Sequence, residues 1–133
     1  MNKFVISESG MFLIKYHFVF CPRYRRRIFK YDGVTERFKE MVREVCEKEG
    51  MELFSIECGE DYAHIHLSGL PNLSPYTIMR LIRTYTNTKI REEFEFLSKM
   101  PSVWTKDFLV ETGETLDKGI LEYYVETQKT RTN

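Results

Sequence analysis

The sequence predicts an α+β fold of the ferredoxin-like type: a four-stranded antiparallel sheet with two helices on one face and an extra helix at the C-terminus. Two observations predict it. The hydrophobic periodicity alternates between that of strands and that of helices, and the resulting order is strand, helix, strand, strand, helix, strand, helix. The chain has 133 residues, of which 42% are hydrophobic. This is enough apolar material for one compact domain over residues 1–133.

The first half of the chain carries three predicted strands and one predicted helix. Residues 11–20 (MFLIKYHFVF) are rich in aromatic and branched side chains, which predicts a strand with Phe18 on one face and His17 on the other. Apolar residues spaced by three and four predict an amphipathic helix over residues 34–49. Two further strands are expected at residues 51–57 and 65–70.

The second half carries two predicted helices and one predicted strand. Ser74 followed by Pro75 is typical of a helix N-terminus, and the helical pattern continues toward residue 94 or 97. Residues 103–110 are expected to form the fourth strand of the sheet. A last helix is expected over about residues 116–129.

Composition and charge argue against several classes of protein. The 20 basic and 20 acidic residues cancel, which argues against a wholly basic DNA-coating protein but leaves room for a local basic patch. Three cysteines without a CxxC pair argue against a disulfide framework or a zinc knuckle. No apolar run approaches the ~18 residues of a membrane span, and residues 1–10 do not resemble a signal peptide. We therefore expect a cytoplasmic protein without membrane association.

His64-Ile65-His66 is the first candidate site. Residues two apart on a strand point to the same face, so both imidazoles could reach one metal ion while Ile65 anchors the strand in the core. Two histidines that bind nothing are the alternative interpretation. Asp61 lies three residues upstream of His64, where it could contact a metal-binding histidine or simply form part of a turn.

Tyr123, Tyr124 and Gln128 form the second candidate site. On a helix, Tyr124 and Gln128 lie one turn apart on the same side. Tyr123 aligns instead with the apolar Leu116 and Ile120, which predicts that Tyr123 faces the core and Tyr124 a more polar side. Most helical tyrosines are packing residues, and the spacing alone does not distinguish a catalytic tyrosine from one of these.

A basic segment interleaved with aromatic residues is the third candidate site. Cationic side chains neutralise phosphates and aromatic rings stack on unpaired bases, so the segment is a candidate surface for nucleic acid. A solvated charged loop is the alternative. The candidate DNA-binding residues, including two from the second predicted helix, are Arg23, Arg25, Arg26, Arg27, Lys30, Arg80 and Arg83.

Four motifs resemble one family over nearly the whole chain. They are KYHFVFCPRYRRRIF at residues 15–29, HIHL at 64–67, VWTKDFLVETGET at 103–115 and YVETQ at 124–128. HIHL alone is weakly specific, but the four motifs in this order and spacing are strongly specific. The sequence resembles the small single-tyrosine HUH transposases of the TnpA type, which move insertion sequences as single-stranded DNA.

The resemblance implies an RRM-like sheet domain that cleaves and rejoins single-stranded DNA hairpins at the ends of insertion sequences. By motif, Tyr124 is the expected nucleophile, and His64, His66 and Gln128 are the expected ligands of a divalent metal ion. Zinc would suit the two histidines, but phosphoryl transfer with an oxygen ligand favours magnesium or manganese. A 5′-phosphotyrosine intermediate conserves the energy of the phosphodiester, so no nucleotide cofactor is expected. A non-catalytic single-strand-binding module and a metal-dependent nuclease that uses water are the alternatives.

The family also implies a homodimer in which the tyrosine helix of one subunit completes the histidine site of the other. The first predicted strand also favours a dimer. The predicted strand at residues 11–20 is long and apolar on both faces, and a ferredoxin-like sheet leaves its edge strands open to a partner. Whether Tyr124 acts in its own subunit or in the partner's remains open from the sequence.

Overall fold

The computed structural model describes residues 4–8 and 10–128. Two short 3₁₀ turns, η1 and η2, lie among the helices and strands. The elements in chain order are β1 (Val5–Ser7), β2 (Gly10–Phe12), β3 (Lys15–Phe20), η1 (Arg23–Arg25), η2 (Ile28–Lys30), α1 (Val34–Glu49), β4 (Leu53–Cys58), β5 (Ala63–Ser68), α2 (Pro75–Glu93), α3 (Glu95–Ser98), β6 (Leu109–Thr112) and α4 (Lys118–Thr127).

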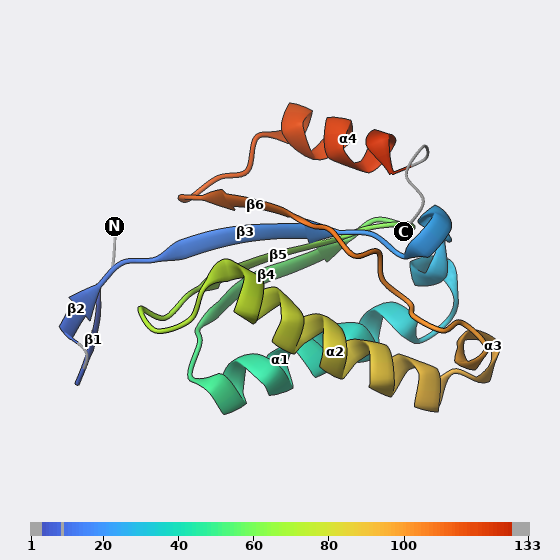
Figure 1. Ribbon diagram of the computed structural model, residues 1–133, viewed down its shortest axis with the longest axis horizontal. Helices are drawn as coiled ribbons and strands as arrows, with labels where there is room; N and C mark the ends of the chain where they lie inside the picture. Colours follow the sequence, from blue (N-terminus) through green and yellow to red (C-terminus); the bar gives the residue numbers. More distant parts are fainter. Residues whose placement is uncertain (1–3, 9, 129–133) are drawn as a thin grey trace.

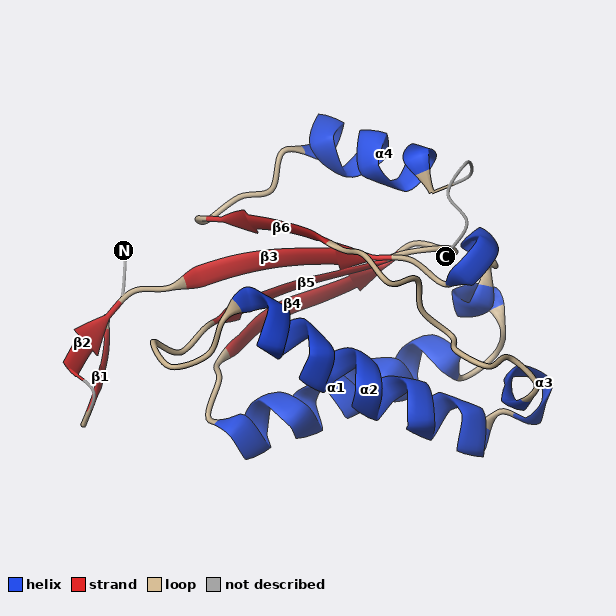
Figure 2. Ribbon diagram, viewed as in Figure 1, coloured by secondary structure: helices blue, strands red, loops and turns tan. Residues whose placement is uncertain are grey.

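The main sheet confirms the predicted ferredoxin-like α+β architecture. Its four strands run in the order β4-β5-β3-β6, and every neighbouring pair is antiparallel. Helices α1 and α2 cover one face, and α4 lies on the opposite face (Figures 1 and 2). The last helix of the chain is therefore placed over the sheet face that a two-layer ferredoxin-like fold leaves open.

Strand β3 divides its side chains between two hydrophobic clusters. Phe18 and Phe20 point toward α1 and α2, where they join the main core. Val19 and, just after the strand, Cys21 point the other way and pack against Tyr124 and Val125 of α4. The sheet is thus buried on both faces at its centre, and the small second cluster attaches α4 to the sheet.

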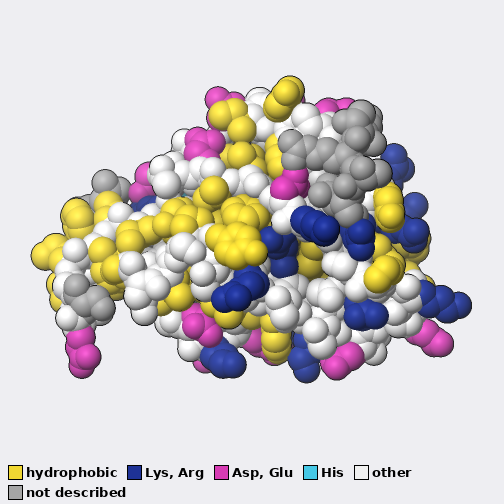
Figure 3. All heavy atoms as spheres, in the orientation of Figure 1, with side chains coloured by type: hydrophobic (Ala, Val, Ile, Leu, Met, Phe, Trp, Pro, Cys, Tyr) yellow, Lys and Arg dark blue, Asp and Glu magenta, His cyan; other side chains and the backbone are white. Residues whose placement is uncertain are grey.

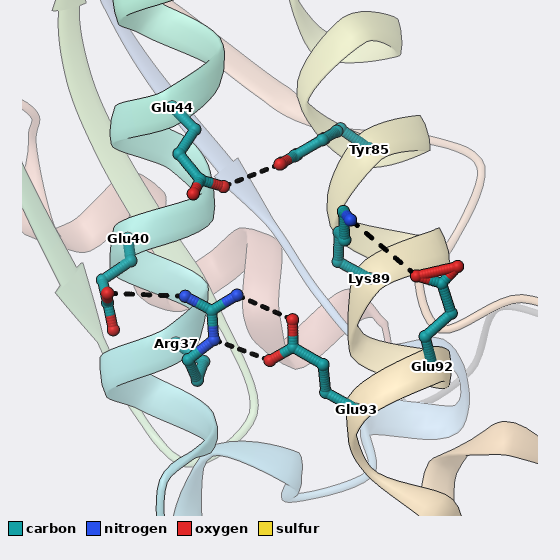
Figure 4. Close-up of polar contacts among 7 residues, drawn as sticks. All are labelled: Arg37, Glu40, Glu44, Tyr85, Lys89, Glu92 and Glu93. Carbon is teal, nitrogen blue, oxygen red and sulfur yellow. Dashed lines mark hydrogen bonds and ion pairs between the residues drawn. The ribbon is translucent and has the colours of Figure 1, made fainter.

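Helices α1 and α2 end and begin where their local signals predict. Gly50 closes α1 with a φ of 79°, a left-handed conformation that glycine adopts without strain. Ser74 caps α2 by accepting a hydrogen bond from the Thr77 backbone N–H at 3.1 Å. Polar contacts link the exposed sides of the two helices (Figure 4): Arg37 donates to both carboxylate oxygens of Glu93 at 2.6 and 2.7 Å, and the Tyr85 hydroxyl donates to Glu44 at 2.7 Å.

The predicted strand at residues 11–20 is wrong in its extent and in its place. Gly10, at a φ of +119°, starts the short strand β2, which pairs with β1 in a separate two-stranded sheet. The chain then leaves that pairing, and the Ile14 carbonyl accepts from the Gly69 N–H at 2.8 Å before β3 begins. Because β3 lies between β5 and β6, it is an interior strand. The open edges belong to β4 and β6, so the edge-strand argument for a dimer does not apply to residues 11–20.

The fourth strand lies later in the chain than predicted. Residues 103–110 were expected to form it, but β6 spans Leu109–Thr112. Val103 and Trp104 are buried in the main core, and Trp104 pairs with Pro22 only as an isolated bridge. Residues 105–108 form a loop, because the chain must pass from that core to the edge of the sheet.

The last helix is close to its predicted range. It begins at Lys118, after Asp117 caps it by accepting from the Gly119 and Ile120 N–H groups at 2.8 and 3.2 Å. The predicted end at residue 129 lies outside the described residues. Within residues 4–8 and 10–128, no helix is long and apolar enough to cross a membrane.

Candidate active site

Three histidines gather on the sheet face that carries α4. His64 and His66 lie on β5 as predicted, and the antiparallel register places His17 of β3 directly opposite His66. The His17 and His66 rings stack with centroids 3.9 Å apart and planes 10° apart. His17 Nδ1 lies 2.9 Å from His64 Nε2, within hydrogen-bond distance. His17 therefore holds contacts with both residues of the HIH motif.

The two histidines of the motif favour the neutral form. Burial lowers the pKa of His64, and the neighbouring His17 lowers it further. The same two causes, in the same order, lower the pKa of His66. Neutral imidazoles keep a free lone pair, which is the form that binds a metal ion. Both side chains are therefore suited to be ligands at neutral pH.

An open groove runs between the histidine side of the sheet and α4. Its volume is about 740 Å³, and it lies beside His64. Leu121, Glu122, Val125 and Glu126 line it from one flank of the helix. Tyr124 is not among the lining residues.

Tyr124, rather than Tyr123, is the tyrosine that faces the protein interior. Tyr124 is only 9% exposed, whereas Tyr123 is 73% exposed. The prediction that Tyr123 faces the core was wrong. It relied on alignment with Leu116 and Ile120, but Leu116 precedes α4 and Ile120 is itself exposed. Tyr124 is the buried tyrosine because its side of α4 packs against Val19 and Cys21.

The Tyr124 hydroxyl is bound by a carboxylate on a neighbouring loop. It donates to Asp107 Oδ1 at 2.8 Å. Burial raises the pKa of the phenol, and the Cys21 thiol raises it further, while Arg83 and a hydrogen bond with Thr105 oppose the change. In this protomer the phenol therefore points to the loop before β6, away from the groove beside His64.

Gln128 is buried with its polar atoms unsatisfied. The residue is 3% exposed, and neither its amide oxygen nor its amide nitrogen has a hydrogen-bond partner among the described residues. His66 Nε2 is likewise buried and unpartnered. An unsatisfied buried amide is costly, so these atoms call for a partner such as water or an ion.

The donor set suits a divalent metal ion. In the described part of the chain, no three or more histidine, cysteine, aspartate or glutamate side chains are placed together to hold a metal ion. A site built on His64 and His66 therefore needs another kind of ligand, and the Gln128 amide oxygen has the right chemistry. Imidazole nitrogens and amide oxygens are both ligands that divalent metal ions accept.

Asp61 lies beside an arginine and not beside the histidines. Its Oδ2 accepts from both Nε and Nη2 of Arg25 at 2.8 Å. Arg25 Nη1 lies 3.8 Å from Glu126 of α4. The contacts of Arg25 thus connect η1, the turn before β5 and the tyrosine helix.

The predicted DNA-binding residues divide into exposed and engaged side chains. Arg25 is engaged as above, and Arg83 donates through Nη1 to the carbonyls of Thr105, Lys106 and Asp107 at 2.9 to 3.0 Å. Arg23 is half-buried. Lys and Arg side chains are concentrated at the right of Figure 3, the end that holds η1 and η2 in Figure 1. The exposed members of the predicted set are Arg26, Arg27, Lys30 and Arg80.

Two residues of the site were missed in the sequence. His17 was placed on a strand face, but its position beside the HIH motif depends on the β3–β5 register. Asp107 lies within the motif at residues 103–115, but nothing in that motif assigns it a role. No local pattern links it to Tyr124, because the two residues lie 17 positions apart in the sequence, one on a loop and one on a helix.

Comparison with known proteins identifies the family. Residues 10–128 match the family described as Transposase IS200 like. The chain therefore belongs to this family of single-tyrosine HUH transposases.

Individual relatives agree with this assignment. Over 101 residues, the chain is 28% identical to the transposase for insertion sequence element IS200 of Salmonella typhimurium, covering 74% of this chain and 66% of that protein. It therefore spans slightly less than two thirds of that relative's length. The ISDra2 transposase TnpA of Deinococcus radiodurans is 18% identical over 125 residues, covering 92% of this chain and 89% of that protein.

Two solved structures share the fold. A transposase structure from Deinococcus radiodurans superposes with a TM-score of 0.84 at 21% identity, covering 96% of this chain and 98% of the other. A REP-associated tyrosine transposase bound to a REP hairpin superposes with a TM-score of 0.57 at 10% identity, covering 90% of this chain and 68% of the other. At these identities the likeness concerns the fold alone.

Proposed function

We propose that the protein is a DNA transposase that cleaves and rejoins single-stranded DNA at the ends of an insertion sequence. In the first step the Tyr124 hydroxyl oxygen attacks the scissile phosphorus, and the bond to the 3′ oxygen breaks. The products are a 5′-phosphotyrosine and a free 3′-hydroxyl. Attack by a 3′-hydroxyl on the phosphotyrosine then rejoins strands without an external energy source, because the phosphodiester energy is conserved.

The observation that carries this proposal is the pair of histidines beneath the tyrosine helix. His64 and His66 lie on one face of β5, and the lowered pKa of each keeps the imidazole neutral. The groove beside His64 is lined by α4, the helix that carries Tyr124. A ligand pair, an open groove and a tyrosine on the adjacent helix are the parts that the reaction requires.

The metal ion would be held by His64 and His66 of one subunit and by Gln128, which shares a side of the helix with Tyr124, of the other. Support comes from the unpartnered His66 Nε2 and Gln128 amide atoms and from the neutral imidazoles. A divalent cation, magnesium or manganese, supplies positive charge that polarises the scissile phosphate. His17 contacts both imidazoles and restricts their orientation.

The DNA substrate is proposed to bind as a single-stranded hairpin. The exposed Arg26, Arg27, Lys30 and Arg80 are available to neutralise phosphates. The exposed Tyr24 ring, which lies among these charges in η1, can stack on an unpaired base. The REP-associated relative was solved with a hairpin, which favours the same class of partner here.

We place the complete site between two subunits of a homodimer. In one protomer the phenol of Tyr124 is bound at Asp107, before the edge strand β6, while His64 lines the groove on the other flank of α4. Within one protomer, the Tyr124 hydroxyl and His64 therefore lie on different sides of α4. A second copy of the chain that docks near this edge would bring its histidines to the tyrosine, and the interface would be isologous.

A denaturing gel with labelled hairpin DNA tests the reaction. Wild-type protein should form a covalent protein–DNA adduct, and Tyr124→Phe should form none while it still binds the hairpin. Tyr123→Phe is the matched control, since that ring is exposed, and it should form adduct normally. Binding without cleavage would identify a single-strand-binding module, and cleavage without adduct would identify a nuclease that uses water.

Mixing two inactive variants tests the shared site. Tyr124→Phe protein combined with His64→Ala/His66→Ala protein should regain adduct formation, because a heterodimer contains one intact composite site. No recovery would show that Tyr124 acts in its own subunit. A particle of 16.0 kDa in light scattering at micromolar concentration would contradict the dimer itself.

A further inference from the structure

The proposed reaction gives no role to the hydrogen bond between Tyr124 and Asp107. Its donor is the hydroxyl group that the proposed reaction uses, and its acceptor Oδ1 lies 2.8 Å away. A general base must lie within about 2.6–3.2 Å of the group from which it takes a proton. Asp107 satisfies this condition in the protein before DNA is bound.

The loop that carries Asp107 is held in place by α2. Arg83 donates from one nitrogen, Nη1, to three successive backbone carbonyls, those of Thr105, Lys106 and Asp107. The Arg83 guanidinium also lies over the Phe108 ring, 5.2 Å from its centroid. These contacts fix the backbone on both sides of the Asp107 carboxylate, so the side chain is positioned by a rigid helix and not by the loop alone.

The other groups that the described residues place around the phenol cannot accept its proton. The Cys21 thiol, at the end of β3, has its pKa raised to about 12 by burial and is therefore protonated at neutral pH. Arg83 is a cation, and Thr105 offers a neutral hydroxyl. His64 lines the groove on the other flank of α4. Among the groups identified around the phenol, Asp107 is the one with basic oxygen atoms in contact.

We propose that Asp107 is the general base that accepts the proton of Tyr124 during strand cleavage, and that Arg83 is the residue that positions it. This rests on the proposed function, in which Tyr124 is the nucleophile. As the phenol oxygen bonds to phosphorus, its proton passes to Asp107 Oδ1, and the departing 3′ oxygen takes a proton from water. In rejoining, the 3′-hydroxyl loses its proton to water, and protonated Asp107 returns its own to the leaving phenolate.

The first test measures the single-turnover rate of adduct formation with a labelled hairpin. Asp107→Asn keeps the shape and the acceptor oxygen but cannot take a proton, so its rate should fall about 100-fold or more at pH 7. The deficit should narrow as the pH rises, because hydroxide then removes the phenolic proton. Asp32→Asn, an exposed carboxylate before α1, is the charge-matched control and should react at the wild-type rate.

The second test measures the contact without any reaction. In protein labelled with ¹³C at the tyrosine ζ carbon, the Tyr124 signal is assigned from its absence in Tyr124→Phe. That signal should shift in Asp107→Ala, where the acceptor is lost, and remain in place in Asp32→Asn. Arg83→Lys, which cannot reproduce the three carbonyl contacts, should lower the adduct rate and shift the same signal.

The outcomes separate this proposal from the function on which it rests. Adduct that persists in Tyr124→Phe would overturn the proposed nucleophile and, with it, the role of Asp107, whatever the NMR signal shows. Loss of adduct in Tyr124→Phe together with an unchanged rate in Asp107→Asn would overturn only the role of Asp107. A faster rate in Asp107→Asn or Asp107→Ala would also overturn it, because Asp107 would then restrain the tyrosine. An unshifted Tyr124 signal in Asp107→Ala would show that the hydrogen bond between Tyr124 and Asp107 does not form, and would overturn the proposal.

Discussion

Removal of two exposed arginines should weaken DNA binding in a way that depends on salt. Arg26 and Arg27 are both exposed, and the ion pair of Arg27 with Glu60 is long, at 3.8 Å, between side chains that are each more than half exposed. Such a pair contributes little to stability, so Arg26→Ala/Arg27→Ala should fold normally. Each phosphate neutralised on a single strand contributes a slope of about −0.7 in log K against log salt, so the slope should become shallower by about 1.4. Between about 50 and 200 mM NaCl, the affinity of the wild-type protein should therefore fall about sevenfold more than the affinity of the double variant.

Fluorescence anisotropy with a labelled hairpin, in a Tyr124→Phe background that prevents cleavage, measures this slope. The double variant Arg43→Ala/Lys48→Ala is the matched control, because it removes two exposed charges from the C-terminal half of α1 and should leave the slope unchanged. Arg25→Ala should behave differently. It leaves the half-buried Asp61 without its partner, so it should also lower the free energy of unfolding. Equal slopes for wild type and the Arg26/Arg27 variant would refute the assignment of this surface to DNA.

Two further predictions concern the metal site and the core. His64→Ala and His66→Ala should each abolish cleavage and weaken Mn²⁺ binding measured by electron paramagnetic resonance. Gln128→Ala should reduce both less, because a neutral amide is the weakest of the three ligands. Undiminished cleavage in EDTA would contradict the role of a metal ion. Thr86→Val should lower the free energy of unfolding by about 1–3 kcal/mol in urea denaturation, because the buried Trp104 Nε1–H loses its acceptor at 3.0 Å; an unchanged midpoint would contradict it.

The elements that could be predicted are those with a strong local signal. The helix over residues 34–49 has the bounds expected from its apolar spacing and from Gly50. The second long helix begins directly after Ser74, as its capping pattern indicates. Both signals depend on residues within one or two turns of each other, so tertiary contacts have little opportunity to override them.

The strands were less predictable because their limits depend on partners elsewhere in the chain. Residues 11–20 are rich in aromatic and branched side chains throughout, yet β2 pairs with β1 and β3 pairs with β5 and β6. Trp104 is typical of a strand, but burial in the main core and its hydrogen bond with Thr86 take it out of the sheet. Side chains such as tryptophan favour strands because they suit a half-buried surface, and a loop that packs against the core offers them a similar environment.

The sequence by itself determined the chain order of the four main-sheet strands and of α1, α2 and α4, and the placement of His64 and His66 on one face, because helix and strand periodicity are local properties of the backbone. The tertiary structure alone decided that His17 lies beside them, that Tyr124 rather than Tyr123 is buried, and that Asp107 binds its hydroxyl. Each of these depends on register or packing between segments far apart in the chain. Such contacts form only when distant segments pack together in the folded chain, so no local sequence pattern predicts them.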